Sequence, residues 1–192
     1  MKNKTFNIII AGTGGQGLIT LLQVIAEAAH IQGFDVKTAE LHGLSQRGGS
    51  INTHIRIGKK VHSPLIPLGS ADLILSLEYL ETLRVIPYSN SKTKFLINCY
   101  SLPFVGTIPE KKITEELNKL IKGDKIIIAA SEICRKKLNK DVLSGIYLVS
   151  YAVFNGLMPL KPESIKKAIA KIIPPKYLDI NQKAYKLAKY AD

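Results

Sequence analysis

Four glycines near the start of the chain form the pattern best suited to binding chemistry. Gly12, Gly14 and Gly17 have the spacing G-x-G-x-x-G, with Gly15 and Gln16 between them. A turn of this kind lets the backbone approach a phosphate closely, and the amide groups that open the following helix attract an anion. Glycines at the same spacing also occur where a strand and a helix pack closely without a ligand. An anion-binding turn and a purely structural turn are therefore both open.

A second polar segment, LHGLSQRGGS, ends at Ser50. Its arginine is followed directly by two glycines, which places a guanidinium next to a backbone concavity. This combination suits a phosphate, a carboxylate or the main chain of a partner protein. The alternative is an ordinary surface loop. The candidate binding residues of this segment are Ser45, Gln46, Arg47, Gly48 and Gly49.

Motifs for self-sufficient catalysis are absent from the sequence. There is no G-x-S-x-G, no phosphate-loop lysine and no cysteine–histidine pair suited to a triad. Glu78 and Glu81 have a helical i,i+3 spacing that favours surface solvation and interaction with the helix dipole over acid–base catalysis. Cys99 and Cys134 lie far apart without a C-x-x-C motif, so we expect reduced core thiols and neither a zinc site nor an iron–sulfur cluster. No catalytic and no metal-binding residue is predicted in this chain.

One acidic residue keeps a dinucleotide-binding alternative open. A Rossmann domain places a carboxylate at the end of its second strand, about twenty residues after the glycines, where it binds a ribose hydroxyl. Glu40 has a comparable position, although the chain then continues into the second glycine segment and not into another crossover helix. The alternative is a stand-alone α/β protein that binds NAD, NADP or another nucleotide.

Apolar runs alternate with amphipathic segments along the chain, a pattern typical of an α/β fold. We expect a single domain, residues 1–192, with three layers: a mostly parallel, Rossmann-like sheet that carries helices on both faces. Ligands of such sheets bind at the carboxyl ends of the strands, where both glycine segments should emerge. The predicted strands are 7–11, 34–41, 51–57 (half exposed), 72–77, 93–98 and 125–129, and the predicted helices are 17–32, 78–84, 113–121, 131–138, 141–157, 164–173 and 177–190.

Two predicted helices, 18–31 and 142–156, are apolar on almost every side. A helix with so little polar surface is covered around most of its circumference. The sheet covers one side, and the other side is expected to lie against a partner protein.

The charge of the chain raises the question of a nucleic-acid partner. The net charge is +12 and the pI is about 9.6, but the excess is mostly lysine at helical spacing in the second half. This favours solvated helix faces over a nucleic-acid surface, and steering of an anionic partner or cofactor is a third interpretation. No apolar run is long enough to span a bilayer, and no cleavage site follows the N-terminus, so we expect a cytoplasmic protein without a membrane partner.

Three stretches together carry a resemblance to a known family: GTGGQG, LHGLSQRGGS and SPLIPLGSADLILSLEYLETLR. They resemble the gamma subunit, or gamma domain, of the 2-oxoacid:ferredoxin oxidoreductases. Within that group the chain is most similar to the small beta subunit of indolepyruvate ferredoxin oxidoreductase. The motifs themselves do not select indolepyruvate over pyruvate, 2-oxoglutarate or branched-chain 2-oxoacids.

The resemblance implies a multi-subunit enzyme that oxidatively decarboxylates a 2-oxoacid to an acyl-CoA and reduces ferredoxin. It implies that thiamine diphosphate, magnesium and iron–sulfur clusters belong to larger partner subunits, so this chain is non-catalytic and holds no tightly bound cofactor. By the same resemblance, the two glycine segments bind coenzyme A or contact a partner chain. The stoichiometry of the complex is open, as is a homodimer of the isolated chain.

Overall fold

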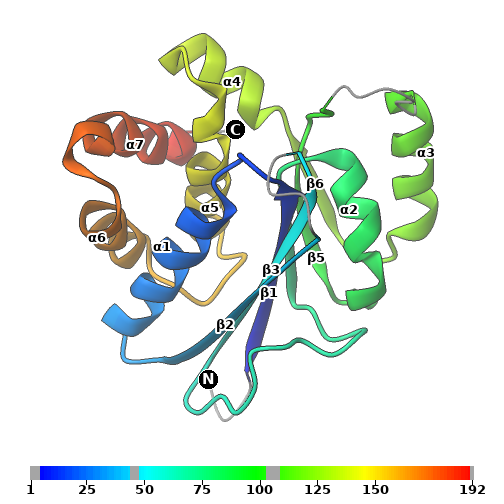
Figure 1. Ribbon diagram of the computed structural model, residues 1–192, viewed down its shortest axis with the longest axis horizontal. Coiled ribbons are helices and arrows are strands. Elements are labelled where there is room, and N and C mark those ends of the chain that lie inside the picture. The colour runs from blue at the N-terminus through cyan, green and yellow to red at the C-terminus, as the bar shows by residue number, and fades with distance from the viewer. Residues whose placement is uncertain (1–4, 44–47, 103–108, 191–192) are drawn as a thin grey trace.

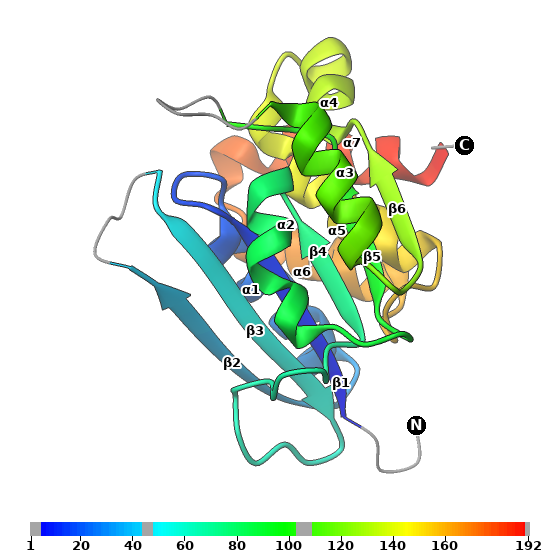
Figure 2. The ribbon, with the colours of Figure 1, turned by 90° about the vertical axis from the view of Figure 1, so that its right-hand side faces the viewer.

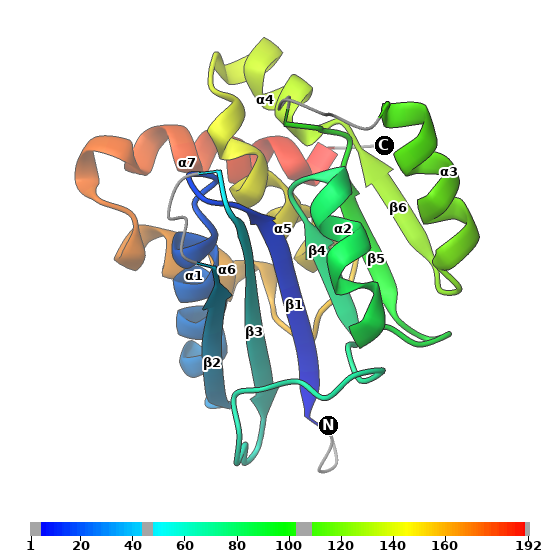
Figure 3. The same ribbon diagram turned by 45° about the vertical axis from the view of Figure 1, so that its right-hand side comes forward.

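The structure, a computed structural model, describes residues 5–43, 48–102 and 109–190. These residues form a six-stranded sheet in the order β2-β3-β1-β4-β5-β6 (Figure 3). β1, β4, β5 and β6 are parallel, whereas β3 is antiparallel to both β1 and β2, so five strands point one way. The mostly parallel sheet is as predicted. The strands are β1 Phe6–Thr13, β2 Asp35–His42, β3 Ser50–Gly58, β4 Leu73–Ser76, β5 Lys94–Asn98 and β6 Lys125–Ile128.

Helices cover both faces of this sheet. α1, α5, α6 and α7 lie on one face, and α2 and α3 lie on the other (Figures 1 and 2). The predicted arrangement, a sheet with helices on both faces, is therefore present. The α-helices are α1 Leu18–Ile31, α2 Tyr79–Val85, α3 Glu110–Leu120, α4 Ala130–Leu138, α5 Ser144–Phe154, α6 Pro162–Ile172 and α7 Pro175–Leu187, with short 3-10 turns at η1 Ile86–Tyr88, η2 Asp141–Leu143 and η3 Ala188–Tyr190.

The alternation of side chains along β1 divides the apolar core in two. Ile8 and Ile10 pack with α1, α5 and α6, whereas Ile9 and Ala11 face the side of α2 and α3. Successive residues of a strand point to opposite faces, so a strand covered on both sides must be apolar throughout. This explains why Ile8, Ile9, Ile10 and Ala11 are all fully buried.

The expectation that helix 142–156 faces a partner protein is wrong. Residues 144–150 of α5 are all buried within the chain itself. The reason is a second helical layer, because α6 and α7 pack against α5 from outside and join the same core. α1 is also largely enclosed, between the sheet and α6, but Ile19 at its N-terminal end is 52% exposed. On these two segments the exposed large apolar side chains are thus those at their ends: Ile19 and Ile31 of α1, and Val142, which precedes α5.

The prediction that strand 51–57 is half exposed also needs correction. The side chains of Thr53, His54 and Ile55 are buried. The loop from Val61 to Ser70 folds back over this strand, and the backbone N–H of Ile66 donates to His54 Nδ1 at 3.0 Å. Since β3 is an inner strand with a loop above it, its polar residues are enclosed.

His54 should make the stability of the protein depend on pH. Its burial lowers the pKa of the imidazole below the ordinary value. An unfolded histidine has a pKa of about 6.5, so as the pH falls below that value the unfolded state takes up a proton before the native state does. As the pH is lowered below about 6.5, the free energy of unfolding should therefore decrease, by at most about 1.4 kcal/mol per pH unit. Urea titrations at several pH values between about 7.5 and 5.5 measure this loss.

The control for this prediction is His54→Gln, which removes the titrating group and keeps a polar side chain. The other histidines are present in both proteins, so the difference between the two pH profiles isolates His54. Parallel profiles for the two proteins would contradict the prediction.

Candidate functional site

The first glycine segment forms a tight turn between β1 and α1, as predicted. Gly15 and Gly17 have positive φ angles of 102° and 79°, a region that side chains with a Cβ rarely adopt. Within the turn, Gln16 uses its side chain internally, because its Oε1 accepts a hydrogen bond from the Thr13 N–H at 2.9 Å. The Gln16 carboxamide oxygen therefore shapes the turn.

The N-terminus of α1 lies directly after this turn. Gly17 is the N-cap and provides no side-chain cap, and no acidic residue occupies the first helical turn, all of which lies within the described part of the chain. The first amides of a helix have no acceptor inside the helix, and the helix dipole is positive at this end. An anionic group placed here would satisfy amides that no side chain of the protein caps.

The second glycine segment meets the first, as the topology predicted. The Gly14 N–H donates to the Gly49 carbonyl at 2.9 Å, and the Gly48 N–H donates to the Gly14 carbonyl at 3.3 Å. β3 makes this contact possible because it begins next to the end of β1, with Ser50 opposite Thr13. Of the predicted binding residues, Ser45, Gln46 and Arg47 lie outside the described residues, so the placement of the Arg47 guanidinium stays a prediction.

The rim that these turns form is hollowed on both sides of the start of α1. A cleft of about 610 Å³ lies between the turn and the ends of β2 and β3. A second, more apolar groove of about 490 Å³ lies between α1, α5 and α7. The first cleft is lined by Gly14, Gly15, Gly17, Leu18, Ile19, Thr20, Glu40, His42 and Ile51. Glycine backbone, a helix N-terminus and apolar side chains thus meet in one place, a composition typical of ligand sites.

Glu40 lines this cleft, but the strand order differs from that of a dinucleotide-binding domain. In that fold the second strand lies next to the first and parallel to it. Here β3 intervenes between β2 and β1 and runs antiparallel to both. Glu40 is therefore carried on an edge strand, one strand further from the glycine turn than a ribose-binding carboxylate would be.

Two carboxylates that were expected at the solvated surface are buried at this rim. Glu78 and Glu81 are only 3% and 4% exposed. Glu78 is the N-cap of α2, and its side chain accepts a hydrogen bond from the Glu81 N–H at 2.8 Å. Burial raises the pKa of the Glu78 carboxyl above its ordinary value, and hydrogen bonds from the backbone N–H groups of Glu81 and Leu102 partly oppose this shift. The predicted solvation at the surface is wrong, because α2 packs against the end of β1 with this side inward. The predicted interaction with the start of the helix is found for Glu78, the N-cap.

The two cysteines have different environments. Cys134 is buried, as expected, and burial raises the pKa of its thiol to about 11. Cys99 follows β5 at the carboxyl edge of the sheet and is exposed, so the expectation of two core thiols is wrong for this residue. Across the ranges described, no group of three or more His, Cys, Asp or Glu side chains could hold a metal ion. No α-helix in those same ranges has the length and hydropathy needed to cross a bilayer.

Known proteins match this chain in sequence and in fold. The family described as pyruvate ferredoxin/flavodoxin oxidoreductase matches residues 7–191. Indolepyruvate oxidoreductase subunit IorB of Archaeoglobus fulgidus is 37% identical over 193 residues, which cover 94% of this chain and 92% of that protein. IorB of Thermococcus kodakarensis is 32% identical over 190 residues, covering 96% and 94%.

A solved structure has the same fold. It is pyruvate oxidoreductase subunit PORC from Thermotoga maritima, which matches with a TM-score of 0.72 and 20% identity over 97% of this chain and 96% of that chain.

Proposed function

We propose a function from one premise: this chain belongs to the pyruvate ferredoxin/flavodoxin oxidoreductase family. It is a non-catalytic subunit of a 2-oxoacid:ferredoxin oxidoreductase, with indolepyruvate as the 2-oxoacid. The complex oxidatively decarboxylates the 2-oxoacid to an acyl-CoA and carbon dioxide, and ferredoxin accepts the electrons. The observation that carries this proposal is the identity of 32–37% with IorB subunits over more than nine-tenths of both chains.

The cofactors of the reaction are assigned to partner chains. An iron–sulfur cluster is held by four cysteine thiolates, and the sequence contains two cysteines, so the clusters are assigned to other chains. In this proposal the larger subunit or subunits hold these groups and transfer electrons to ferredoxin. A cytoplasmic location for the complex is part of the same proposal, and neither nucleic acid nor membrane is a partner.

The two glycine turns, Gly14 to Gly17 and Gly48 with Gly49, form one rim, called the glycine rim below. This rim is proposed to bind an anionic group of coenzyme A. The uncapped N-terminus of α1, the backbone of Gly14 to Gly17 and the adjoining cleft support this assignment. The positive net charge of the chain would also attract a cofactor that carries several phosphate charges. Gly48 and Gly49, which bond to Gly14, would hold the turn in place, and the larger subunit would complete the site.

Reconstitution tests the proposal. The isolated chain should oxidise no 2-oxoacid, whereas mixing it with the larger subunit should produce indolepyruvate-dependent, coenzyme A-dependent reduction of ferredoxin. The larger subunit alone is the control and should have little activity. Activity of the isolated chain, or full activity of the larger subunit without it, would contradict the proposal.

A stand-alone nucleotide-binding protein is the second candidate, because Glu40 lines the cleft beside the glycine turn. It requires measurable affinity of the isolated chain for NAD or NADP. Isothermal titration with each nucleotide distinguishes the two candidates, since the oxidoreductase subunit should give no saturable heat with either.

A further inference from the structure

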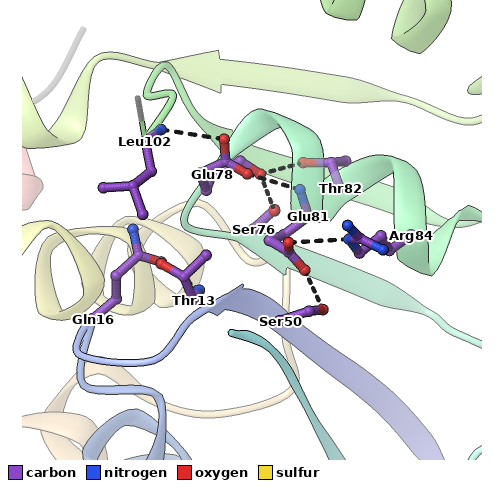
Figure 4. A network of polar contacts seen from close by, with 9 residues as sticks. All are labelled: Thr13, Gln16, Ser50, Ser76, Glu78, Glu81, Thr82, Arg84 and Leu102. Atoms are coloured by element: carbon purple, nitrogen blue, oxygen red, sulfur yellow. Dashed lines mark hydrogen bonds and ion pairs between the residues drawn. The ribbon is translucent and has the colours of Figure 1, made fainter. Parts of the chain in front are cut away.

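The side chain of Glu81, on α2, reaches Ser50 at the start of β3 (Figure 4). It is almost completely buried, and each of its two carboxylate oxygens accepts one hydrogen bond. The Ser50 hydroxyl donates to Oε2, and the Arg84 Nε donates to Oε1 at 3.1 Å. A buried carboxylate costs free energy unless such donors surround it, so these two partners keep Glu81 in one orientation.

Ser50 connects Glu81 to the glycine rim. It is the first residue of β3 and lies opposite Thr13, the last residue of β1. The residue before it, Gly49, accepts the hydrogen bond from the Gly14 N–H. The Ser50 hydroxyl, which bonds to Glu81, and the Gly49 carbonyl, which bonds to Gly14, therefore belong to adjacent residues.

Glu78 holds the other end of this arrangement. Its side chain caps the first turn of α2 by accepting from the Glu81 N–H, while its backbone carbonyl accepts from the hydroxyls of Ser76 and Thr82 (Figure 4). These bonds fix the start of α2 against the end of β4. The backbone of Glu81 is thus held in place by contacts other than the bond between its side chain and Ser50.

We propose that Glu81 is a positioning residue of the glycine rim: through Ser50 it holds Gly48 and Gly49 against Gly14, and so keeps the turn in its anion-binding shape. The inference rests on the proposed function for what the turn binds, but the contact it describes lies entirely within this chain. Neither Glu81 nor Ser50 is required to touch coenzyme A or the 2-oxoacid.

The first test measures the rim itself. Ser50→Ala removes the hydroxyl and leaves Glu81 its bond to Arg84, so the fold should survive. Amide hydrogen exchange of the full chain, followed by NMR, should then be about tenfold faster or more at Gly14 and Gly48, the size expected for loss of a hydrogen bond to a charged group. Exchange in the centre of β1 should change little.

Three further variants keep this test specific. Ser70→Ala is the matched control, because its hydroxyl bonds to the Leu68 carbonyl near the amino end of β4, and it should leave Gly14 unchanged. Ser50→Thr keeps the hydroxyl and should restore slow exchange. Glu81→Gln keeps one acceptor oxygen for two donors and should give an intermediate exchange rate at Gly14 and Gly48. The double variant with Ser50→Ala should exchange hardly faster than Ser50→Ala alone, because both changes break the same bond. Unchanged exchange at Gly14 and Gly48 in Ser50→Ala would overturn the inference.

The second test uses the complex reconstituted with the larger subunit. Ser50→Ala should raise the Michaelis constant for coenzyme A severalfold while leaving kcat and the Michaelis constant for the 2-oxoacid nearly unchanged, a separation that general destabilisation would not produce. Faster exchange at Gly14 with an unchanged constant for coenzyme A would leave the positioning role of Glu81 standing and overturn the proposed binding of coenzyme A at this rim.

Discussion

Replacing Gly12 with alanine is expected to raise the apparent Michaelis constant for coenzyme A about tenfold in the reconstituted complex. An added Cβ at this position would lie 2.6 Å from Gln16 Oε1 and 3.3 Å from both Leu77 Cβ and Leu18 Cδ1. The Gln16 side chain is the part best able to move, but it holds the Thr13 N–H. Loss of that bond would change the shape of the turn, and a displacement of about 1 Å in a binding site costs up to about two orders of magnitude.

The measurement is steady-state kinetics with coenzyme A and the 2-oxoacid varied separately. The constant for the 2-oxoacid and the value of kcat at saturating coenzyme A should change much less, because the turn is not proposed to take part in the chemistry. If the constant for coenzyme A stayed at its original value, the glycine turn would be a structural turn and no more.

Gly33→Ala is the matched control for Gly12→Ala. Gly33 follows the other end of α1 and has a φ angle of 75°, so alanine there strains the backbone by about 1–2 kcal/mol without touching the rim. The two variants should lose comparable stability, yet only Gly12→Ala should weaken the use of coenzyme A. An equal effect of both on that constant would point to a general loss of stability.

Replacing Gly145 with valine should destabilise the protein by about 2–3 kcal/mol, the upper part of the range for overpacking a core. Gly145 is buried where α5 packs against α1, and an added Cβ would lie 2.6 Å from Leu21 Cδ1. Helix propensity predicts the opposite sign, since glycine is a poorer helix former than valine. The free energy of unfolding from denaturant titration therefore distinguishes packing from propensity.

A compensating change sharpens this prediction. Leu21→Val shortens the side chain that the new group would strike, so Gly145→Ala combined with Leu21→Val should be more stable than the sum of the two single effects indicates. Additive effects, or a gain in stability from Gly145→Val alone, would mean that α1 and α5 are not held at this close distance.

Much of the site could be predicted from local sequence. The order of an apolar strand, closely spaced glycines and an apolar helix specifies a tight strand-to-helix turn, and Gly15 and Gly17 indeed have the positive φ angles that such a turn needs. The alternation of strands and helices indicated a sheet covered on both faces, and the two separate core clusters confirm it. These features depend on neighbouring residues, so spacing and periodicity are sufficient to predict them.

Contacts between distant segments could be predicted from the sequence only in part. That both glycine segments reach the same rim follows from the carboxyl-end rule for parallel sheets. The bonds from Gly14 to Gly48 and Gly49, however, depend on β3 being antiparallel and adjacent to β1. The sequence contains no local signal for that insertion. The same insertion separates Glu40 from the glycine turn by a strand, which weakens the dinucleotide alternative that spacing alone left open.

The sequence by itself determined the strand–turn–helix unit, the α/β class and the family, because local spacing and short motifs carry that information. Only the tertiary structure decided which surfaces are buried. It enclosed α5 beneath α6 and α7, where a partner had been expected, and it turned Glu78 and Glu81 inward to bind backbone and Ser50. Burial of a side chain depends on what packs over it from elsewhere in the chain, and a one-dimensional pattern of polar and apolar residues does not contain that information.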